Sequence, residues 1–118
     1  MKTSQALIYW GWRTSTGKAN VRCSGGSYQA EKLPMRLDLY NHSPTGFEWG
    51  YGGSGPAQLA LAILADVLED DDRAVQLHQQ FKWRAIASIH RKERWYLSRS
   101  KVLEIVSEIE KDTSSLKA

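Results

Sequence analysis

The chain lacks the features that mark secreted, disulfide-bonded and membrane-spanning proteins. Its 118 residues include a single cysteine, Cys23, so no disulfide can form within the chain. No apolar run approaches the roughly 20 residues that a membrane-spanning helix needs. The N-terminal apolar stretch is too short for the apolar region of a signal peptide, and no small-residue cleavage site follows it. We therefore expect a cytoplasmic protein that does not associate with membranes, and we interpret Cys23 as a small, half-buried residue.

Signatures of catalysis and of cofactor binding are also scarce. The glycine-rich segment 50–55 matches neither G-x-x-x-x-G-K-[ST] nor G-x-G-x-x-G, and no lysine follows it to reach a phosphate. The potential ligand residues do not fall at metal-binding spacing, and no motif surrounds a serine–histidine–aspartate set. We expect no cofactor and no metal, and we favour a binding protein over an enzyme.

What the chain does contain is an ordinary globular composition with an uneven distribution of charge. Hydrophobic residues make up 42% and charged residues 25%, and a chain of this length forms one domain. The net charge is +3, but acids concentrate in 66–72 and bases in 82–101. A basic cluster of this kind binds phosphate or an acidic partner, or it is a solvated face that the acidic turn balances. The sequence leaves both interpretations open.

The N-terminal half is rich in strand-forming residues. We predict strands at 6–13 and 20–24, joined as a hairpin by a Thr/Ser/Gly turn. Apolar and polar residues alternate at 35–40 and 47–51, which predicts two further half-buried strands. The stretch 28–34 stays ambiguous, because it ends in a proline that cannot donate a hydrogen bond inside a sheet.

The C-terminal half shows helical periodicity. An Ala- and Leu-rich helix is predicted from Pro56 to about residue 68, and it is apolar almost all round, so it should be buried on several sides. A second helix is predicted over about 73–89 and a third from near Ser98 or Ser100. Residues 95–97 fit a short strand or an extended link.

The order of these elements predicts the fold class. Four strands followed by three helices indicate an α+β domain, with an N-terminal antiparallel sheet of about three to four strands packed against three C-terminal helices. Asp71 or Asp72 is expected to cap the second helix. We place the single domain at residues 1–112 and expect 113–118 to be a frayed tail.

A glycine-rich stretch, G-Y-G-G-S-G-P at residues 50–56, joins the last of these predicted strands to the first helix. Glycines let a ligand or another chain approach the backbone closely, and a helix N-terminus attracts anions. The alternative is a tight corner, in which glycines permit positive φ and Ser54 or Gly55 caps the helix. Local chemistry favours the corner.

Aromatic residues lie beside this turn. Phe47, Trp49 and Tyr51 share one face of a predicted strand, where they form either a stacking platform or part of the core. Five tryptophans exceed what a small core needs, so we expect one or two on a functional surface.

Polar residues also cluster around the preceding loop: Asp38, Asn41, His42, Ser43 and Glu48. A histidine beside carboxylates can perform acid–base chemistry, so a small hydrolase using His42, Asp38 and Glu48 is a weaker hypothesis. A turn whose side chains bond to the backbone is the interpretation we favour.

A basic and aromatic segment begins at F-K-W-R, residues 81–84. Its cations and tryptophan can contact phosphates and bases, or the cationic stems can cover the edge of the ring. The candidate nucleic-acid residues of this segment are Lys82, Trp83, Arg84, Arg91, Lys92 and Arg94.

The central signature of the chain resembles that of a small family of bacterial and phage proteins, known only as a domain of unknown function. It reads R-L-D-L-Y-N-H-S-P-T-G-F-E-W-G-Y-G-G-S-G-P-A-Q-L-A-L-A-I-L-A-D, and F-K-W-R and W-Y-L follow it. The resemblance covers about residue 8 to the end of the third helix. It implies no activity, cofactor or catalytic residue, but it implies a short protein carried by phages, plasmids and their hosts. The motif it implies holds Arg36, Asp38, Asn41, His42, Ser43, Glu48, Gly50, Gly52, Gly53, Ser54 and Gln58.

These features and the resemblance together predict a non-enzymatic binding protein of a phage or mobile element. It would hold a host or phage protein partner, or an anionic small ligand such as a nucleotide, at the glycine-rich turn. Inhibition of a host defence system is the role that this setting suggests. The predicted binding residues are Asp38, Asn41, His42, Ser43, Glu48, Trp49, Tyr51, Gly52, Gly53, Ser54 and Gln58. The alternative is a nucleic-acid-binding protein that uses the basic segment 82–101.

Overall fold

Four antiparallel strands form one sheet in the computed structural model, which describes residues 6–25 and 29–117. The strands are β1 (Ile8–Arg13), β2 (Ala19–Ser24), β3 (Glu31–Lys32) and β4 (Trp95–Ser98). Their order across the sheet is β3-β2-β1-β4, so β1 is central and pairs with its hairpin partner β2 and with the late strand β4. The predicted α+β class and the predicted N-terminal hairpin are confirmed.

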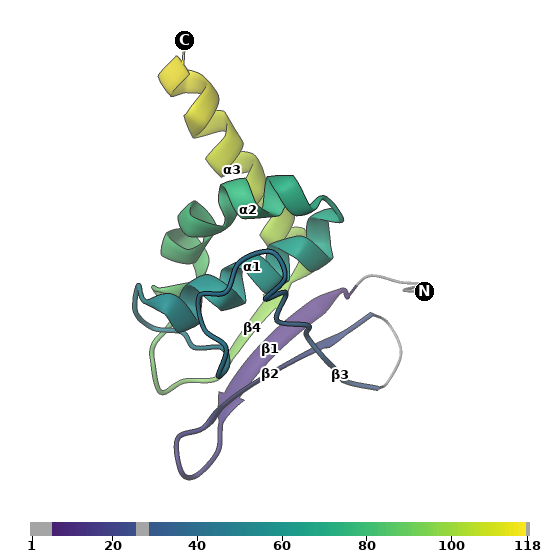
Figure 1. Ribbon diagram of the computed structural model, residues 1–118, viewed down its shortest axis with the longest axis vertical. Helices are drawn as coiled ribbons and strands as arrows, with labels where there is room; N and C mark the ends of the chain where they lie inside the picture. The colour runs from purple at the N-terminus through teal and green to yellow at the C-terminus, as the bar shows by residue number, and fades with distance from the viewer. Residues whose placement is uncertain (1–5, 26–28, 118) are drawn as a thin grey trace.

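The helices stack on one side of this sheet (Figure 1). They are α1 (Ser54–Leu68), α2 (Asp71–Phe81), a short π-helical continuation η1 (Lys82–Ile86) and α3 (Arg99–Lys117). α1 lies between the sheet and α2 and is buried from Gly55 to Val67, as its all-round apolar sequence predicts. Among the described residues, no helix has both the length and the apolar character needed to cross a membrane.

Alternation along β1 separates an inner face of the sheet from an outer face. Tyr9 and Gly11 are buried on the inner face, and the Tyr9 hydroxyl donates a hydrogen bond to Asp66 of α1. Burial raises the pKa of Tyr9 well above its ordinary value, so this hydroxyl stays protonated and can donate. Trp10 and Trp12 are partly exposed on the outer face.

The strands predicted at 35–40 and 47–51 do not form, so both predictions were wrong. Residues 37–39 form a turn after Arg36, which has φ of 57°, and 47–51 have no regular secondary structure. Within the described chain neither segment has a partner strand, and the main chain of 35–43 bonds instead to the side chain of Gln58. The fourth strand is β4, so one strand follows the first two helices.

Two helix starts differ from their predicted caps. The N-cap of α1 is Gly53, which makes no side-chain capping bond, instead of Ser54 or Gly55. The N-cap of α2 is Asp70 instead of Asp71 or Asp72, because the Asp70 carboxylate accepts a hydrogen bond from the amide of the residue three positions on.

The remaining helix boundaries lie close to those predicted. Helical backbone continues from α2 through η1 to Ile86, three residues short of the predicted end. α3 starts at Arg99, between the two serines predicted for it, and it includes 113–117 of the segment expected to be a frayed tail.

Gly11 of the central strand has no room for a side chain. A Cβ at this position would lie 2.3 Å from Nε1 of the buried Trp95 ring, so we expect Gly11→Ala to lower the free energy of unfolding by about 1–3 kcal/mol through overpacking. Urea unfolding measures this, with the same change in a Trp95→Phe background as the comparison. The smaller ring should reduce the cost of the alanine, and an equal cost in both backgrounds would contradict the steric explanation.

Candidate functional site

The glycine-rich turn lies at the start of α1, and close packing accounts for its glycines. Gly50 has φ of 88°, which side-chain-bearing residues rarely adopt. A Cβ on Gly52 would lie 2.1 Å from the Trp83 ring, and a Cβ on Gly55 would lie 2.5 Å from Cβ of Glu48. These contacts support a structural corner at this position.

The glycine-rich turn contacts the basic segment 82–101, so the two binding regions that were predicted as alternatives lie side by side. Lys82, which is buried, donates from Nζ to the carbonyl of Gly52 at 3.1 Å, and its ammonium lies 4.5 Å from the centre of the Trp83 ring. The Arg91 guanidinium lies 4.9 Å from the centre of the Tyr51 ring. The basic segment therefore packs against the glycine-rich turn, with Trp83 and Tyr51 exposed beside it.

Gln58 is fully buried in α1 and satisfies four main-chain groups of the preceding loop. Its Oε1 accepts from the amides of His42 at 2.8 Å and Ser43 at 3.1 Å. Its Nε2 donates to the carbonyls of Met35 at 2.7 Å and Tyr40 at 3.0 Å. This amide thus fixes the path of the loop 35–43 against the helix.

Other polar residues of the signature also bond within the protein. Arg36 lies 3.1 Å from Asp38 and 2.9 Å from Asp71, and its guanidinium holds the pKa of Asp38 below the ordinary value. Ser43 donates from Oγ to the carbonyl of Gly46 at 2.7 Å, as expected of a turn residue. Asn41 and Ser54 are exposed.

Glu48 forms an ion pair with Arg13, the last residue of β1. The Arg13 Nη2 lies 2.6 Å from Glu48 Oε1, and its Nε donates to the carbonyl of Arg91 at 2.8 Å. The same guanidinium lies 4.4 Å from the ring centre of Trp49, which is fully buried in the core against Trp95. Glu48 therefore helps to hold the sheet, the glycine-rich turn and the loop before β4 together.

His42 and His78 form a histidine pair between the loop and α2. Their Nε2 atoms lie 2.9 Å apart, and His78 Nδ1 lies 2.6 Å from the carbonyl of Val75. A carbonyl only accepts, so His78 carries its proton on Nδ1 and neutral His42 donates from Nε2 to His78. Burial, then the charges of His78 and Lys82, lowers the pKa of His42, and burial also lowers the pKa of His78.

The hydrolase hypothesis needs Asp38, His42 and Glu48 to act together. Among the described residues no interaction joins these three, because each bonds to a different partner on a different element. No group of three or more potential metal-ligand side chains occurs among them either. The geometry therefore gives this hypothesis no support.

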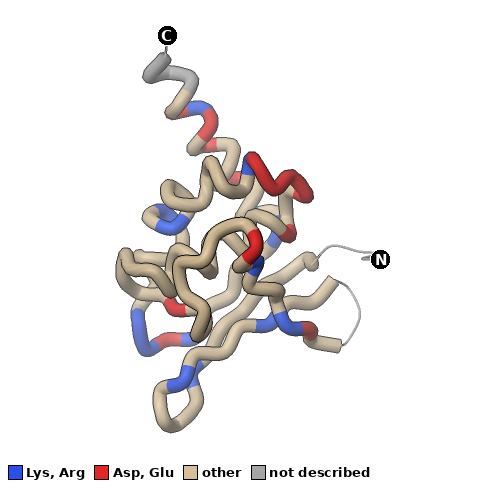
Figure 2. The backbone as a smooth tube through the Cα atoms, in the orientation of Figure 1, with Lys and Arg blue, Asp and Glu red and all other residues tan. Residues whose placement is uncertain are grey.

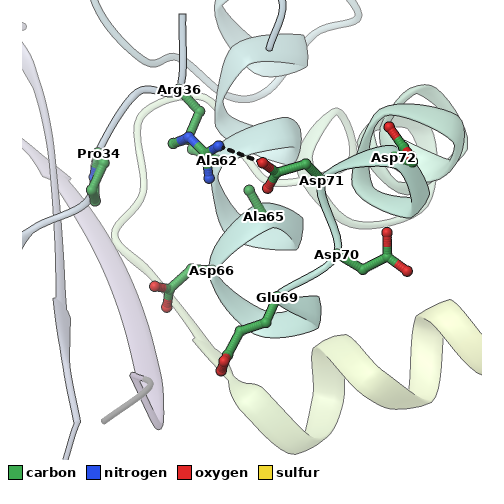
Figure 3. Close-up of a pocket in the computed structure, with 9 residues that line it drawn as sticks. All are labelled: Pro34, Arg36, Ala62, Ala65, Asp66, Glu69, Asp70, Asp71 and Asp72. Carbon is green, nitrogen blue, oxygen red and sulfur yellow. Dashed lines mark hydrogen bonds and ion pairs between the residues drawn. The ribbon is translucent and has the colours of Figure 1, made fainter. Parts of the chain in front are cut away.

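An acidic cavity of about 490 Å³ opens where α1 turns into α2 (Figure 3). Several of its carboxylates have structural partners: Asp66 accepts from Tyr9, Asp70 caps α2, and Asp71 pairs with Arg36 across the cavity mouth. Its lining consists of Pro34, Arg36, Ala62, Ala65, Asp66, Glu69, Asp70, Asp71 and Asp72.

The predicted nucleic-acid residues differ in burial and in pairing. Lys82 is buried, Trp83 is exposed, and the exposed Arg84 pairs with Asp112 of α3. The remaining cations, Arg91, Lys92 and Arg94, are exposed in the loop before β4.

The outer face of the sheet holds residues that were not predicted for any site. Trp10, Trp12 and Tyr96 lie there with Gly11 and Arg94 around a shallow hollow of about 220 Å³. The sequence Tyr9–Trp10–Gly11–Trp12 could have shown that Trp10 and Trp12 share one face of the strand, since residues two apart do so. It does not show which of the two faces the helices cover.

The fold and these surfaces describe a small α+β protein in which no helix of the described chain covers the outer face of the sheet. The chain matches the model of a family of unknown function (DUF6166) over residues 9–108, so it belongs to this family, as the resemblance implied. No curated protein and no solved structure matches the chain.

Replacing Gln58 should test how far the fold depends on its amide. Gln58→Leu would leave buried main-chain groups of the loop unsatisfied, so we expect a loss of about 2–4 kcal/mol in the free energy of unfolding. Gln79→Leu makes the same change at an exposed position of α2 and should cost little. Similar losses for both variants in urea unfolding would contradict the structural role of Gln58.

The histidine pair should make stability depend on pH. The folded state lowers both pKa values below 6.5, so the unfolded chain binds more protons; the pair's contribution is present above about pH 6.5 and is lost as the pH falls. We expect urea unfolding between about pH 7.5 and about pH 5 to show this loss, and a His42→Phe/His78→Phe variant to show less of it. His90→Gln, at an exposed site, is the control. An unchanged pH profile in the double variant would exclude the pair as the cause.

Proposed function

We propose that the protein is a non-enzymatic nucleic-acid-binding protein that contacts phosphates through one basic surface. The observation that carries this proposal is a set of cations with no ion pair to any other described residue. We define the basic surface by these residues: Lys18, Arg22, Lys32, Arg91, Lys92 and Arg94. They come from the β1–β2 hairpin, the strands β2 and β3, and the loop before β4.

Glu31 and Glu93 adjoin these cations in sequence, but among the described residues neither forms an ion pair with any of the six. The acidic turn between α1 and α2 lies away from the β1–β2 hairpin and from the loop before β4 (Figure 2). Elsewhere, arginines pair with carboxylates, as Arg73 does with Glu110 and Arg84 with Asp112. A solvated face balanced by nearby acids is therefore a poorer explanation than a surface that attracts an anionic polymer.

The glycine-rich turn is less suited to an anionic ligand than the basic surface is. A hollow of about 320 Å³ beside the turn is lined by Lys18, Tyr51 and Ser54, but also by the carboxylate-bearing Glu48. That carboxylate already engages the Arg13 guanidinium, so Lys18 is the one cation among the described lining residues that an anion there could meet. A partner or small ligand at this turn stays a prediction.

The cellular setting also stays a prediction. The lone cysteine and the lack of a signal peptide predicted a cytoplasmic protein, and the family resemblance predicted a protein of a phage or mobile element that acts against host defence. Binding nucleic acid is compatible with such a role and does not require it.

Binding should depend strongly on salt. With three or four phosphate contacts, we expect the affinity for a labelled oligonucleotide to fall roughly 10- to 100-fold between about 50 mM and about 200 mM salt. Fluorescence anisotropy measures this fall directly. An absence of binding at the lower salt concentration would refute the proposed function.

A charge reversal locates the contact. Lys92→Glu in the basic surface should weaken binding and flatten the salt dependence. Lys111→Glu, at an exposed position of α3, changes the net charge by the same amount and should leave affinity nearly unchanged. Equal effects of the two variants would mean that only net charge matters and that the basic surface is not the contact.

A further inference from the structure

The outer face of the sheet is the side that α1 leaves uncovered. Within residues 6–25 and 29–117 the helices lie on the other side (Figure 1). Three aromatic side chains lie on this uncovered face. Trp10 and Trp12 of β1 are partly exposed, and Tyr96 of β4 is 66% exposed. Water therefore contacts apolar ring surface that a ligand could cover.

Strand register places these rings beside cations. Trp10 lies directly opposite Tyr96 on one neighbouring strand and opposite Arg22 on the other, so these three residues form a row across the sheet. The Arg22 guanidinium lies 5.7 Å from the centre of the Trp12 ring. Arg94, which immediately precedes Trp95, lines the same hollow as the three rings. Rings and positive charges are thus neighbours on this face.

The outer face carries no carboxylate on its described strands. The positions whose side chains share this face, from the register of the four strands, are Ile8, Trp10, Trp12, Asn20, Arg22, Ser24, Lys32, Tyr96 and Ser98. Glu31 pairs with Cys23 of the inner face, and Glu93 is the exposed acid in the turn before β4. The face therefore combines exposed rings with positive charge.

This combination selects among possible occupants. A second copy of the chain would bring Arg22, Lys32 and Arg94 against the same cations of its partner, which is unfavourable. A duplex keeps its bases stacked within the helix and would use the cations alone. A single strand offers bases that can stack on each ring and phosphates that can pair with the cations.

We propose that the outer face binds single-stranded nucleic acid, with unpaired bases stacked on Trp10, Trp12 and Tyr96. This inference rests on the proposed function, since Arg22, Lys32 and Arg94 belong to the basic surface. It adds the class of nucleic acid and the residues that select it.

Titrations with matched oligonucleotides test the inference. Single-stranded DNA, RNA of the same sequence and the corresponding DNA duplex are each titrated into the full chain, with anisotropy and tryptophan fluorescence as readouts. We expect tighter binding of the single strands, with quenching of tryptophan emission. Tyr96→Ala should weaken single-strand binding by roughly 5- to 100-fold and leave duplex binding unchanged. Tyr40→Ala removes another ring, 53% exposed on the loop against α1, and should have little effect.

The outcomes separate this inference from the proposed function. Salt-dependent binding that is equal for single strand and duplex, and insensitive to Tyr96→Ala, would leave the proposed function standing and overturn the inference. Absence of binding to all three oligonucleotides would overturn both. A stable dimer in sedimentation that Tyr96→Ala dissociates, without single-strand binding, would show that a second copy covers the face and would also overturn the inference. Preference between DNA and RNA, once single strands are bound, identifies which of the two the face takes.

Discussion

A buried amide in the middle of an apolar helix is the constraint on which much of this structure depends. Gln58 cannot be placed in the core without partners, because a buried polar group left unsatisfied costs free energy. The loop 35–43 supplies four main-chain partners, and in doing so it gives up pairing in the sheet. The position of that loop in turn brings Arg36 to Asp71 and His42 to His78, so both ends of α2 are tied to it.

Elements whose structure depends on nearby residues were predicted from the sequence, and elements that depend on distant residues were not. The β1–β2 hairpin and α1 are encoded locally, by strand-forming residues around a turn and by an uninterrupted apolar run, and both were predicted. The segment 35–40 alternates like a strand, but its outcome is set by Gln58, which lies outside it. β4 was ambiguous because it pairs, among the described strands, with β1 alone, more than 80 residues earlier in the chain. Local patterns do not contain such pairings.

The candidate site was less predictable than the fold, because similar residues serve different purposes in it. Trp49 was expected to contribute to a surface and is buried, whereas Trp10 and Trp12 came from a segment read only as a strand. Glu48 looked like a reactive carboxylate beside glycines, but its partner Arg13 lies 35 residues away in sequence. The basic segment 82–101 was recognised by its charge, yet Arg84 pairs with Asp112 and Lys82 bonds to the carbonyl of Gly52. Only the three-dimensional pairing of cations distinguishes those that remain for a ligand.

The packing of β1 should let the outer face of the sheet bind a ligand with little change in its backbone. Trp10 and Trp12 alternate with Tyr9 and Gly11 on the central strand, so each outward ring is flanked by residues locked into the core. Arg13, at the end of the same strand, fixes the loop before β4 through the carbonyl of Arg91 and fixes the glycine-rich turn through Glu48. The backbone that carries these rings is fixed by strand pairing, so a ligand would not have to order it on binding. The glycine-rich turn thus has an indirect role in the proposed binding. Its contacts with Lys82 and Arg91 position the loop before β4, which carries part of the basic surface.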